Sequence, residues 1–151
     1  MYVSDGYQAS WLPISVSGEI EAGAGKGSAS LGFPTANVRC DPGACIPRGV
    51  YVCWAHLNGK FEPEGAVANI GERPSVDDSR SVTTEVHLFS DHGSSDLRGM
   101  VLGVTLCGWI RPEIRFEGLE HLSERIAADV HLAKVALSSS EYLKQLKPQE
   151  R

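Results

Sequence analysis

The 151-residue sequence predicts a mostly β fold, an antiparallel barrel or strongly bent sheet with one long helix packed against it. Three observations predict this fold class. Five or six strand-like runs follow one another at hairpin spacing, no helical pattern lies between them, and the apolar period becomes helical only after Phe116. A chain of this length is expected to form a single domain, residues 1–151, around one core.

The clearest strand pair lies in the first half of the chain. Residues 49–57 are rich in β-branched and aromatic side chains, as strands are. Asn58-Gly59 follows directly and is the strongest short signal for a hairpin. The partner strand is expected over residues 65–70 and is expected to be ended by Gly71 and Pro74. Residues 14–20 alternate apolar with small or polar side chains and predict an earlier strand.

Two more strands are expected before the helix. Along residues 82–89 the alternation places Glu85 and His87 on one face and apolar side chains on the other. A polar loop then leads to an apolar run over residues 100–110. We expect this run to be stopped by Arg111-Pro112, because proline cannot donate to a strand ladder.

A long amphipathic helix closes the fold. Apolar side chains recur at steps of three and four, which is the stripe of a helix packed on one face. They are Leu119, Leu122, Ile126, Val130, Ala133 and Leu137. Ser138 to Glu141 is similar to a capping box and predicts a short tail helix over residues 141–146. The core is therefore expected within residues 14–137.

Charge and composition exclude several function classes. The net charge is −5, whereas a nucleic-acid binder should carry a basic footprint. Residues 23–50 nevertheless hold three basic side chains and one acidic one, which suits a small phosphate-bearing ligand. No run approaches the ~20 apolar residues that span a membrane. The four cysteines form no C-x-x-C pair, so we expect neither a zinc finger nor a disulfide framework, and the protein is expected to be cytoplasmic.

A glycine-rich loop is the first candidate site. Gly23, Gly25 and Gly27 surround Lys26 just after a predicted strand. Glycines let the backbone approach a ligand, and consecutive N–H groups can form an anion-binding nest. The loop matches neither the P-loop nor the dinucleotide fingerprint, so a plain flexible turn is the competing interpretation.

Two polar side chains form the second candidate site, and a carboxylate later in the chain is a separate candidate. Thr35 and Asn37 point the same way if their segment is extended, and their neutral oxygens suit Mg²⁺. Turn capping explains the same two residues equally well. Glu85 has the carboxylate expected of a general base for a hydroxyl nucleophile, although an exposed strand face is the commoner explanation.

The third candidate site follows the last strand. Arg111, Glu113 and Phe116 place a guanidinium, a carboxylate and an aromatic ring close together in the sequence. Such a loop can grip a flat heterocycle. A salt-bridged turn leading into the helix is the alternative.

In this order the motifs resemble the riboflavin kinase family. Family sequences carry a G-x-G-R-G loop, then L-G-[FI]-P-T-A-N, G-V-Y, N-I-G-x-R-P, E-V-H or E-T-H, L-R-P-E and a closing helix. The matching segments here are GAGKG at 23–27, LGFPTAN at 31–37, GVY at 49–51, NIGERP at 69–74, EVH at 85–87 and IRPE at 110–113. The resemblance covers about residues 16–136, and the probability that all six blocks agree by chance is very small.

The resemblance implies a six-stranded Greek-key barrel that transfers the γ-phosphate of ATP to the ribityl 5′-hydroxyl of riboflavin, giving FMN and ADP. It implies Glu85 as catalytic base. It implies Mg²⁺, with Zn²⁺ or Mn²⁺ as alternatives, at Thr35 and Asn37. The implied ATP-binding residues are Gly23, Gly25, Lys26, Gly27, Leu31, Thr35, Leu88 and Arg98. The implied riboflavin or FMN residues are Arg111, Glu113, Ile114 and Phe116.

The sequence departs from the family pattern mainly near the nucleotide. Lys26 stands where arginine is usual, which keeps the charge but loses the bidentate fork. Arg98 replaces a tyrosine expected beside adenine, and Ile110 replaces the leucine of L-R-P-E. These differences bear on nucleotide affinity rather than on the reaction.

Two other function classes compete with the kinase. A non-catalytic flavin- or nucleotide-binding barrel would keep the loops but would not need Glu85 beside Thr35 and Asn37. A single-strand nucleic-acid barrel needs a basic groove with interleaved aromatics, which the charge balance disfavours. We therefore expect a monofunctional, monomeric kinase with riboflavin and ATP as its partners, binding neither nucleic acid nor membrane.

Overall fold

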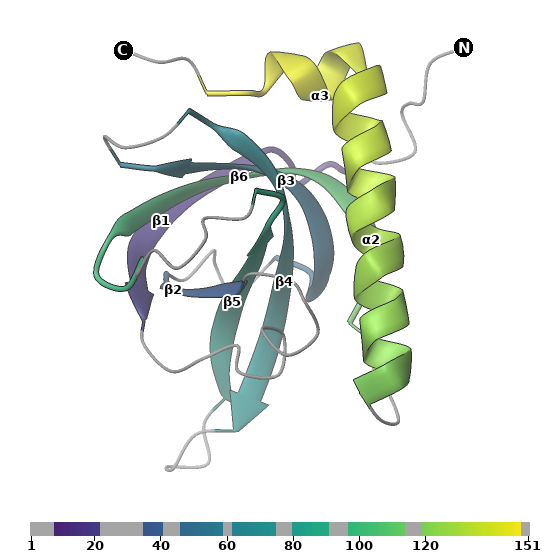
Figure 1. The fold of residues 1–151 in the computed structure, drawn as a ribbon. Helices are drawn as coiled ribbons and strands as arrows, with labels where there is room; N and C mark the ends of the chain where they lie inside the picture. Colours follow the sequence, from purple (N-terminus) through teal and green to yellow (C-terminus); the bar gives the residue numbers. More distant parts are fainter. Residues whose placement is uncertain are drawn as a thin grey trace.

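The structure, a computed structural model, describes residues 8–21, 35–40, 46–58, 62–74, 80–90, 97–113 and 119–148. Within these ranges six strands precede two helices (Figure 1). They are β1 Ile14–Glu21, β2 Thr35–Arg39, β3 Gly49–Leu57, β4 Glu64–Pro74, β5 Arg80–Leu88, β6 Val101–Pro112, α2 Leu119–Ser139 and α3 Glu141–Gln145.

The strands form a closed antiparallel barrel in the order β1-β2-β5-β4-β3-β6. Strands β3, β4 and β5 follow one another as neighbours, and β6 returns to lie beside β3, which is the Greek-key arrangement. Helix α2 runs along the outside of the barrel over β3 and β4 (Figure 1). The predicted barrel with a C-terminal helix is thus confirmed.

Strands β2, β4 and β6 differ most from the prediction. The segment of Thr35 and Asn37 was not assigned to a strand from the sequence. In the structure it forms β2, which pairs with both β1 and β5. Strand β4 does not end at Gly71 but continues to Pro74, because Gly71 pairs with Thr83 in an unbroken ladder. Strand β6 likewise includes Pro112, which pairs with Gly49 at the last position of the strand, where a missing N–H costs least.

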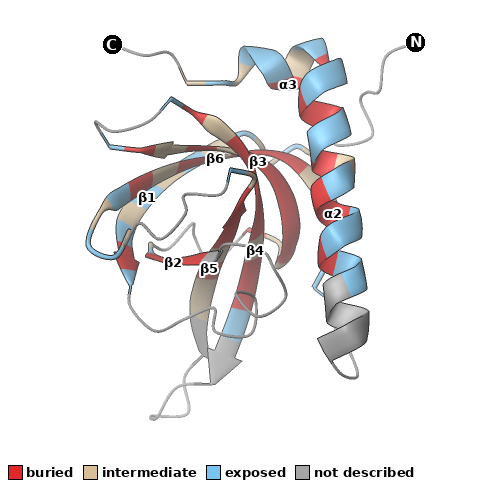
Figure 2. Ribbon diagram, viewed as in Figure 1, coloured by how far each residue is buried: buried red, intermediate tan, exposed pale blue. Residues whose placement is uncertain are grey.

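The barrel wall separates two hydrophobic cores. Figure 2 shows buried residues along β3 and β4 and at intervals along α2. The interior core is closed by side chains of every strand, and Tyr51, Ile70, Leu102 and Leu106 in it are fully buried. The exterior core lies beneath the buried face of α2, where Ile126, Val130, Ala133 and Leu137 pack on Val50, Val52, Val67 and Cys107. Alternate residues of one strand therefore serve different cores, and Cys53 and Cys107 are each fully buried in one of them.

The short helix α3 is anchored by its cap and by one tryptophan. Ser140 caps it, since its hydroxyl accepts a hydrogen bond from the Leu143 amide at 3.2 Å, so the cap lies at Ser140 rather than at the predicted Ser138. The Trp54 indole donates to the Leu143 carbonyl at 2.9 Å, and the Leu143 side chain is 1% exposed. Helix α3 is thereby fixed to the outer wall of β3.

Candidate active site

A row of polar side chains crosses the outer face of the barrel beside α2. Strand pairing places Glu21 opposite Asn37, Asn37 opposite Glu85, and Glu85 opposite Asn69, on β1, β2, β5 and β4 respectively. Cβ atoms of directly opposed residues lie about 4.5–5.5 Å apart, so side chains of neighbours in the row are within reach of one another. Glu85 is half-buried, and Asn37 is buried. The row brings the predicted base and one predicted metal ligand together.

The same row leads from the candidate nucleotide side to the candidate flavin side. Beyond Asn69 it continues through Val50 on β3 to Arg111 on β6. Glu21, at its other end, borders a surface cavity of about 610 Å³ that is also lined by Arg39 and Arg98. Glu85 therefore lies between the residues predicted to bind ATP and those predicted to bind riboflavin.

The turn that carries Arg98 is fixed to β1 by backbone hydrogen bonds. The Gly99 amide donates to the Ile20 carbonyl, and the Ile20 amide donates to the Met100 carbonyl, both at 2.9 Å. Gly99 has φ of +85°, a conformation that side chains disfavour and glycine accepts. The turn is thus held in one place, and exposed Arg98 stands at the cavity with Glu19 and Glu21.

On the side predicted to bind flavin, the Glu113 carboxylate lies over a glycine of β4. A Cβ built on Gly71 would overlap Oε1 of Glu113 and would lie 3.2 Å from its carboxyl carbon and 3.3 Å from the Thr83 hydroxyl. Thr83 is two residues from Glu85 on the same strand face, a separation of about 7 Å. The absence of a side chain at position 71 is therefore what allows Glu113 to lie beside this row.

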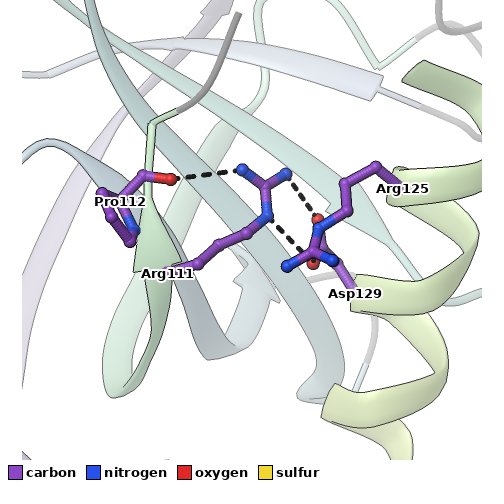
Figure 3. A network of polar contacts seen from close by, with 4 residues as sticks. All are labelled: Arg111, Pro112, Arg125 and Asp129. Carbon is purple, nitrogen blue, oxygen red and sulfur yellow. Dashed lines mark hydrogen bonds and ion pairs between the residues drawn. The ribbon is translucent and has the colours of Figure 1, made fainter. Parts of the chain in front are cut away.

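Arg111 is tied to the helix (Figure 3). Its Nε donates to Oδ1 of Asp129 at 3.2 Å and its Nη2 donates to Oδ2 at 2.8 Å, while Nη1 donates to the Pro112 carbonyl at 3.2 Å. Both residues are buried, Arg111 being 8% and Asp129 3% exposed. The half-exposed Arg125 approaches the same carboxylate at 3.7 Å. Such a bidentate pair fixes orientation as well as charge.

A buried histidine adjoins Glu85. His87 is 6% exposed and opposes Thr35 on β2 and Val67 on β4. Burial lowers the pKa of His87, and the Glu85 and Asp129 carboxylates oppose that shift. The imidazole therefore lies in the field of both carboxylates and favours its neutral form near neutral pH.

Comparison with known proteins decides the family. A family model described as riboflavin kinase, or flavokinase, matches residues 11–137. The chain belongs to the riboflavin kinase family. Human riboflavin kinase is 35% identical over 139 residues, which cover 88% of this chain and 86% of the human one. The bifunctional riboflavin kinase/FMN phosphatase of Arabidopsis thaliana is 36% identical over 138 residues, 87% of this chain and 35% of that protein.

A solved structure agrees on the fold. The crystal structure of riboflavin kinase from Trypanosoma brucei superposes with a TM-score of 0.71 over 95% of this chain and 88% of the other, at 24% identity. Membership of the riboflavin kinase family confirms the predicted resemblance and makes ATP-dependent phosphorylation of riboflavin to FMN the activity of the chain.

The remaining predicted residues of this riboflavin kinase divide into two groups. Leu88 is 5% exposed and faces the barrel interior, away from the polar row. Thr35 opposes His87 through its backbone, but its side chain lies outside the described residues, as do several whole residues of the predicted sites. Those residues are Gly23, Gly25, Lys26, Gly27, Leu31, Ile114 and Phe116.

Two residues of this site carried no role in the sequence predictions. Asn69 flanks Glu85 on the side opposite to Asn37, which only the register of β4 against β5 reveals. Asp129 lies three residues after Ile126 and four before Ala133, within the apolar stripe of α2. A carboxylate in such a stripe signals a buried partner, and this was the available clue.

Proposed function

We propose that this riboflavin kinase transfers the γ-phosphate of ATP directly to riboflavin, with Glu85 as general base at the centre of the polar row. The single observation that carries the proposal is the strand register, which sets Glu85 between Asn37 and Asn69. Glu85 also lies between the cavity at Arg98 and the carboxylate of Glu113. The two substrates would thus approach the base from opposite sides.

In the proposed step the ribityl 5′-hydroxyl oxygen attacks the γ-phosphorus. The new O–P bond forms while the bond to the bridging β–γ oxygen breaks, and ADP leaves with that electron pair. Glu85 accepts the hydroxyl proton and aligns the oxygen. Because a phosphoryl transfer of this kind needs little covalent help, positioning and charge stabilisation by the site supply most of the rate.

A magnesium ion fits the residues on β2. Within the described ranges no three acidic, histidine or cysteine side chains cluster as a metal site. Asn37 and Thr35 offer instead neutral oxygens, which suit Mg²⁺ that takes its other ligands from water and phosphates. When bound, the ion would neutralise phosphate charge. Asn37, directly opposite Glu85, would hold it next to the reacting oxygens.

The substrate contacts divide along the row. Arg98 and the segment of Gly23, Gly25, Lys26, Gly27 and Leu31 are proposed for ATP. Glu113, Ile114 and Phe116 are proposed for riboflavin, and Arg111 supports them from β6. We also propose a single-domain, monomeric and cytoplasmic enzyme that does not bind nucleic acid. Neither described helix has the length and hydropathy to cross a membrane.

Steady-state kinetics of Glu85→Gln test the proposed base. Loss of the carboxylate should lower kcat by at least ~100-fold, the usual size of a general-base effect, while riboflavin binding changes little. Glu72→Gln is the matched control, because Glu72 is an exposed β4 carboxylate paired with Arg48 at 3.1 Å and lies outside the row. A near-normal kcat in Glu85→Gln would remove Glu85 from this role.

A non-catalytic flavin or nucleotide carrier is the competing interpretation of the same surface. Such a barrel would bind riboflavin with the affinity of an enzyme but would form no FMN with ATP and metal present. Titration with riboflavin, ATP and an oligonucleotide beside the activity assay separates the enzyme, the carrier and a nucleic-acid barrel.

A further inference from the structure

Helix α2 carries a buried carboxylate that the reaction itself does not use. Asp129 is 3% exposed and binds the Arg111 guanidinium through both of its oxygens, at 2.8 and 3.2 Å. A buried ion pair contributes little net stability compared with apolar side chains of similar volume, because both charges must be desolvated. The ion pair between β6 and α2 is therefore expected to have a role other than stabilising the fold.

The Arg111 guanidinium connects helix α2 to the backbone at the end of β6. Its Nη1 donates to the Pro112 carbonyl at 3.2 Å, at the residue where β6 ends (Figure 3). Pro112 has a fixed φ, so holding its carbonyl determines the direction in which the chain leaves the strand. The next residue is Glu113, whose carboxylate lies over Gly71 and beside Thr83.

Asp129 also acts electrostatically on β5. Its charge acts on His87, which is buried next to Glu85 on β5. One carboxylate on α2 thus binds the strand end that leads to Glu113 and also influences a histidine on the strand that carries the base. The exposed Arg125 is the outermost member of the group, 3.7 Å from Asp129.

We propose that Asp129 is a positioning residue for riboflavin: it holds Arg111, Arg111 holds the Pro112 carbonyl, and Glu113 is thereby presented beside Glu85. The inference rests on the proposed function and deepens it. It gives Arg111 the task of fixing the segment after β6 rather than of touching the flavin. Substitution of Asp129 or Arg111 should then weaken the binding of riboflavin and leave the binding of ATP unchanged.

Asp129→Asn is the first test, because it keeps one acceptor oxygen but removes the charge and the bidentate geometry. We expect the KM for riboflavin to rise at least ~10-fold, with the KM for ATP within about twofold of wild type. Glu124→Gln, on the exposed side of the same helix, is the control and should leave both KM values unchanged. A folded Asp129→Asn protein with wild-type riboflavin KM overturns the proposal.

A second variant covers the case in which Asp129→Asn fails to fold, since it leaves a buried guanidinium without its full partner. Replacing the pair by apolar side chains, Arg111→Met with Asp129→Leu, should keep the melting temperature near wild type. If the pair only stabilised the fold, this double variant would bind riboflavin normally, and the proposal would be wrong. If it positions Glu113, the double variant is stable but shows the same ~10-fold loss for riboflavin alone.

Failure of the proposed function gives a different result. If the wild-type chain made no FMN, no KM could be measured. Quenching of riboflavin fluorescence would still report riboflavin binding. Weaker quenching in Asp129→Asn than in wild type and Glu124→Gln would support the positioning role, and equal quenching in all three would refute it.

Discussion

Replacing Gly71 by alanine is expected to damage riboflavin use without damaging the fold. The added Cβ would overlap Oε1 of Glu113, which must move by about 1 Å to reach ordinary van der Waals separation. Gly71 does not have a left-handed φ, so alanine fits its backbone, and the displaced group is the end of a flexible side chain. The free energy of unfolding should therefore stay within about 1 kcal/mol of wild type.

The catalytic cost follows from the displacement. Misplacing a substrate-binding group by about 1 Å costs up to ~100-fold in rate, so kcat/KM for riboflavin should fall about 10- to 100-fold, or roughly 1.4–2.7 kcal/mol. FMN formation measured by fluorescence-detected chromatography over a riboflavin series gives this value. Gly65→Ala is the control: its Cβ would lie 2.5 Å from the Phe89 ring and 2.9 Å from Leu137, so it should destabilise the fold by about 1–3 kcal/mol instead.

A double-mutant cycle with Glu113→Ala decides whether Gly71 acts through Glu113. Once that carboxylate is absent, Gly71→Ala has nothing to displace and should change kcat/KM by less than about twofold. An undiminished loss in the Glu113→Ala background, or wild-type kinetics of Gly71→Ala alone, would refute the reasoning.

The remaining predictions concern the metal, acid stability and the tail helix. Thr35→Ala should raise the Mg²⁺ concentration needed for half-maximal rate, with the riboflavin KM unchanged; an unaltered magnesium dependence would remove Thr35 from the metal site. Because burial lowers the pKa of His87, the unfolded chain takes up a proton near its ordinary pKa of 6.5 that the folded chain resists, so stability should fall as pH drops below about 6.5. His87→Gln should flatten this fall in melting temperature between pH 7.5 and 5.5, and an equally steep profile would contradict it. Leu143→Ala should cost about 2–5 kcal/mol by leaving a cavity beneath α3, and a loss under about 1 kcal/mol in urea unfolding would show that α3 is not docked as described.

Periodicity predicted most of the fold because each long element serves a continuous core. The stripe of α2 and the alternation of β1 and β5 are read directly from the chain. Strand β2 has only five residues, too few for a period to be visible, and it is defined by its two neighbours. The ends of β4 and β6 were misplaced because pairing partners, at Thr83 and Gly49, carry the ladder past glycine and proline.

The candidate site was predictable in its residue types but not in its arrangement. Glu85, Asn37 and Asn69 are distant in sequence, and only the barrel order β2-β5-β4 makes them neighbours. The resemblance supplied a role for Glu85 and Asn37 but none for Asp129. The partner of Arg111 could not be predicted, since it depends on where α2 crosses the outer wall.

Single-turnover chemistry is the most direct test of Glu85 as the base at the centre of the row. Enzyme in excess over riboflavin is mixed with saturating ATP and Mg²⁺, quenched at short times, and its FMN and ADP are quantified. We predict that wild type and Glu72→Gln form both products in equal amounts at the same rate, while Glu85→Gln binds riboflavin but forms FMN at least ~100-fold more slowly. An FMN burst in Glu85→Gln as fast as in wild type would contradict the central claim.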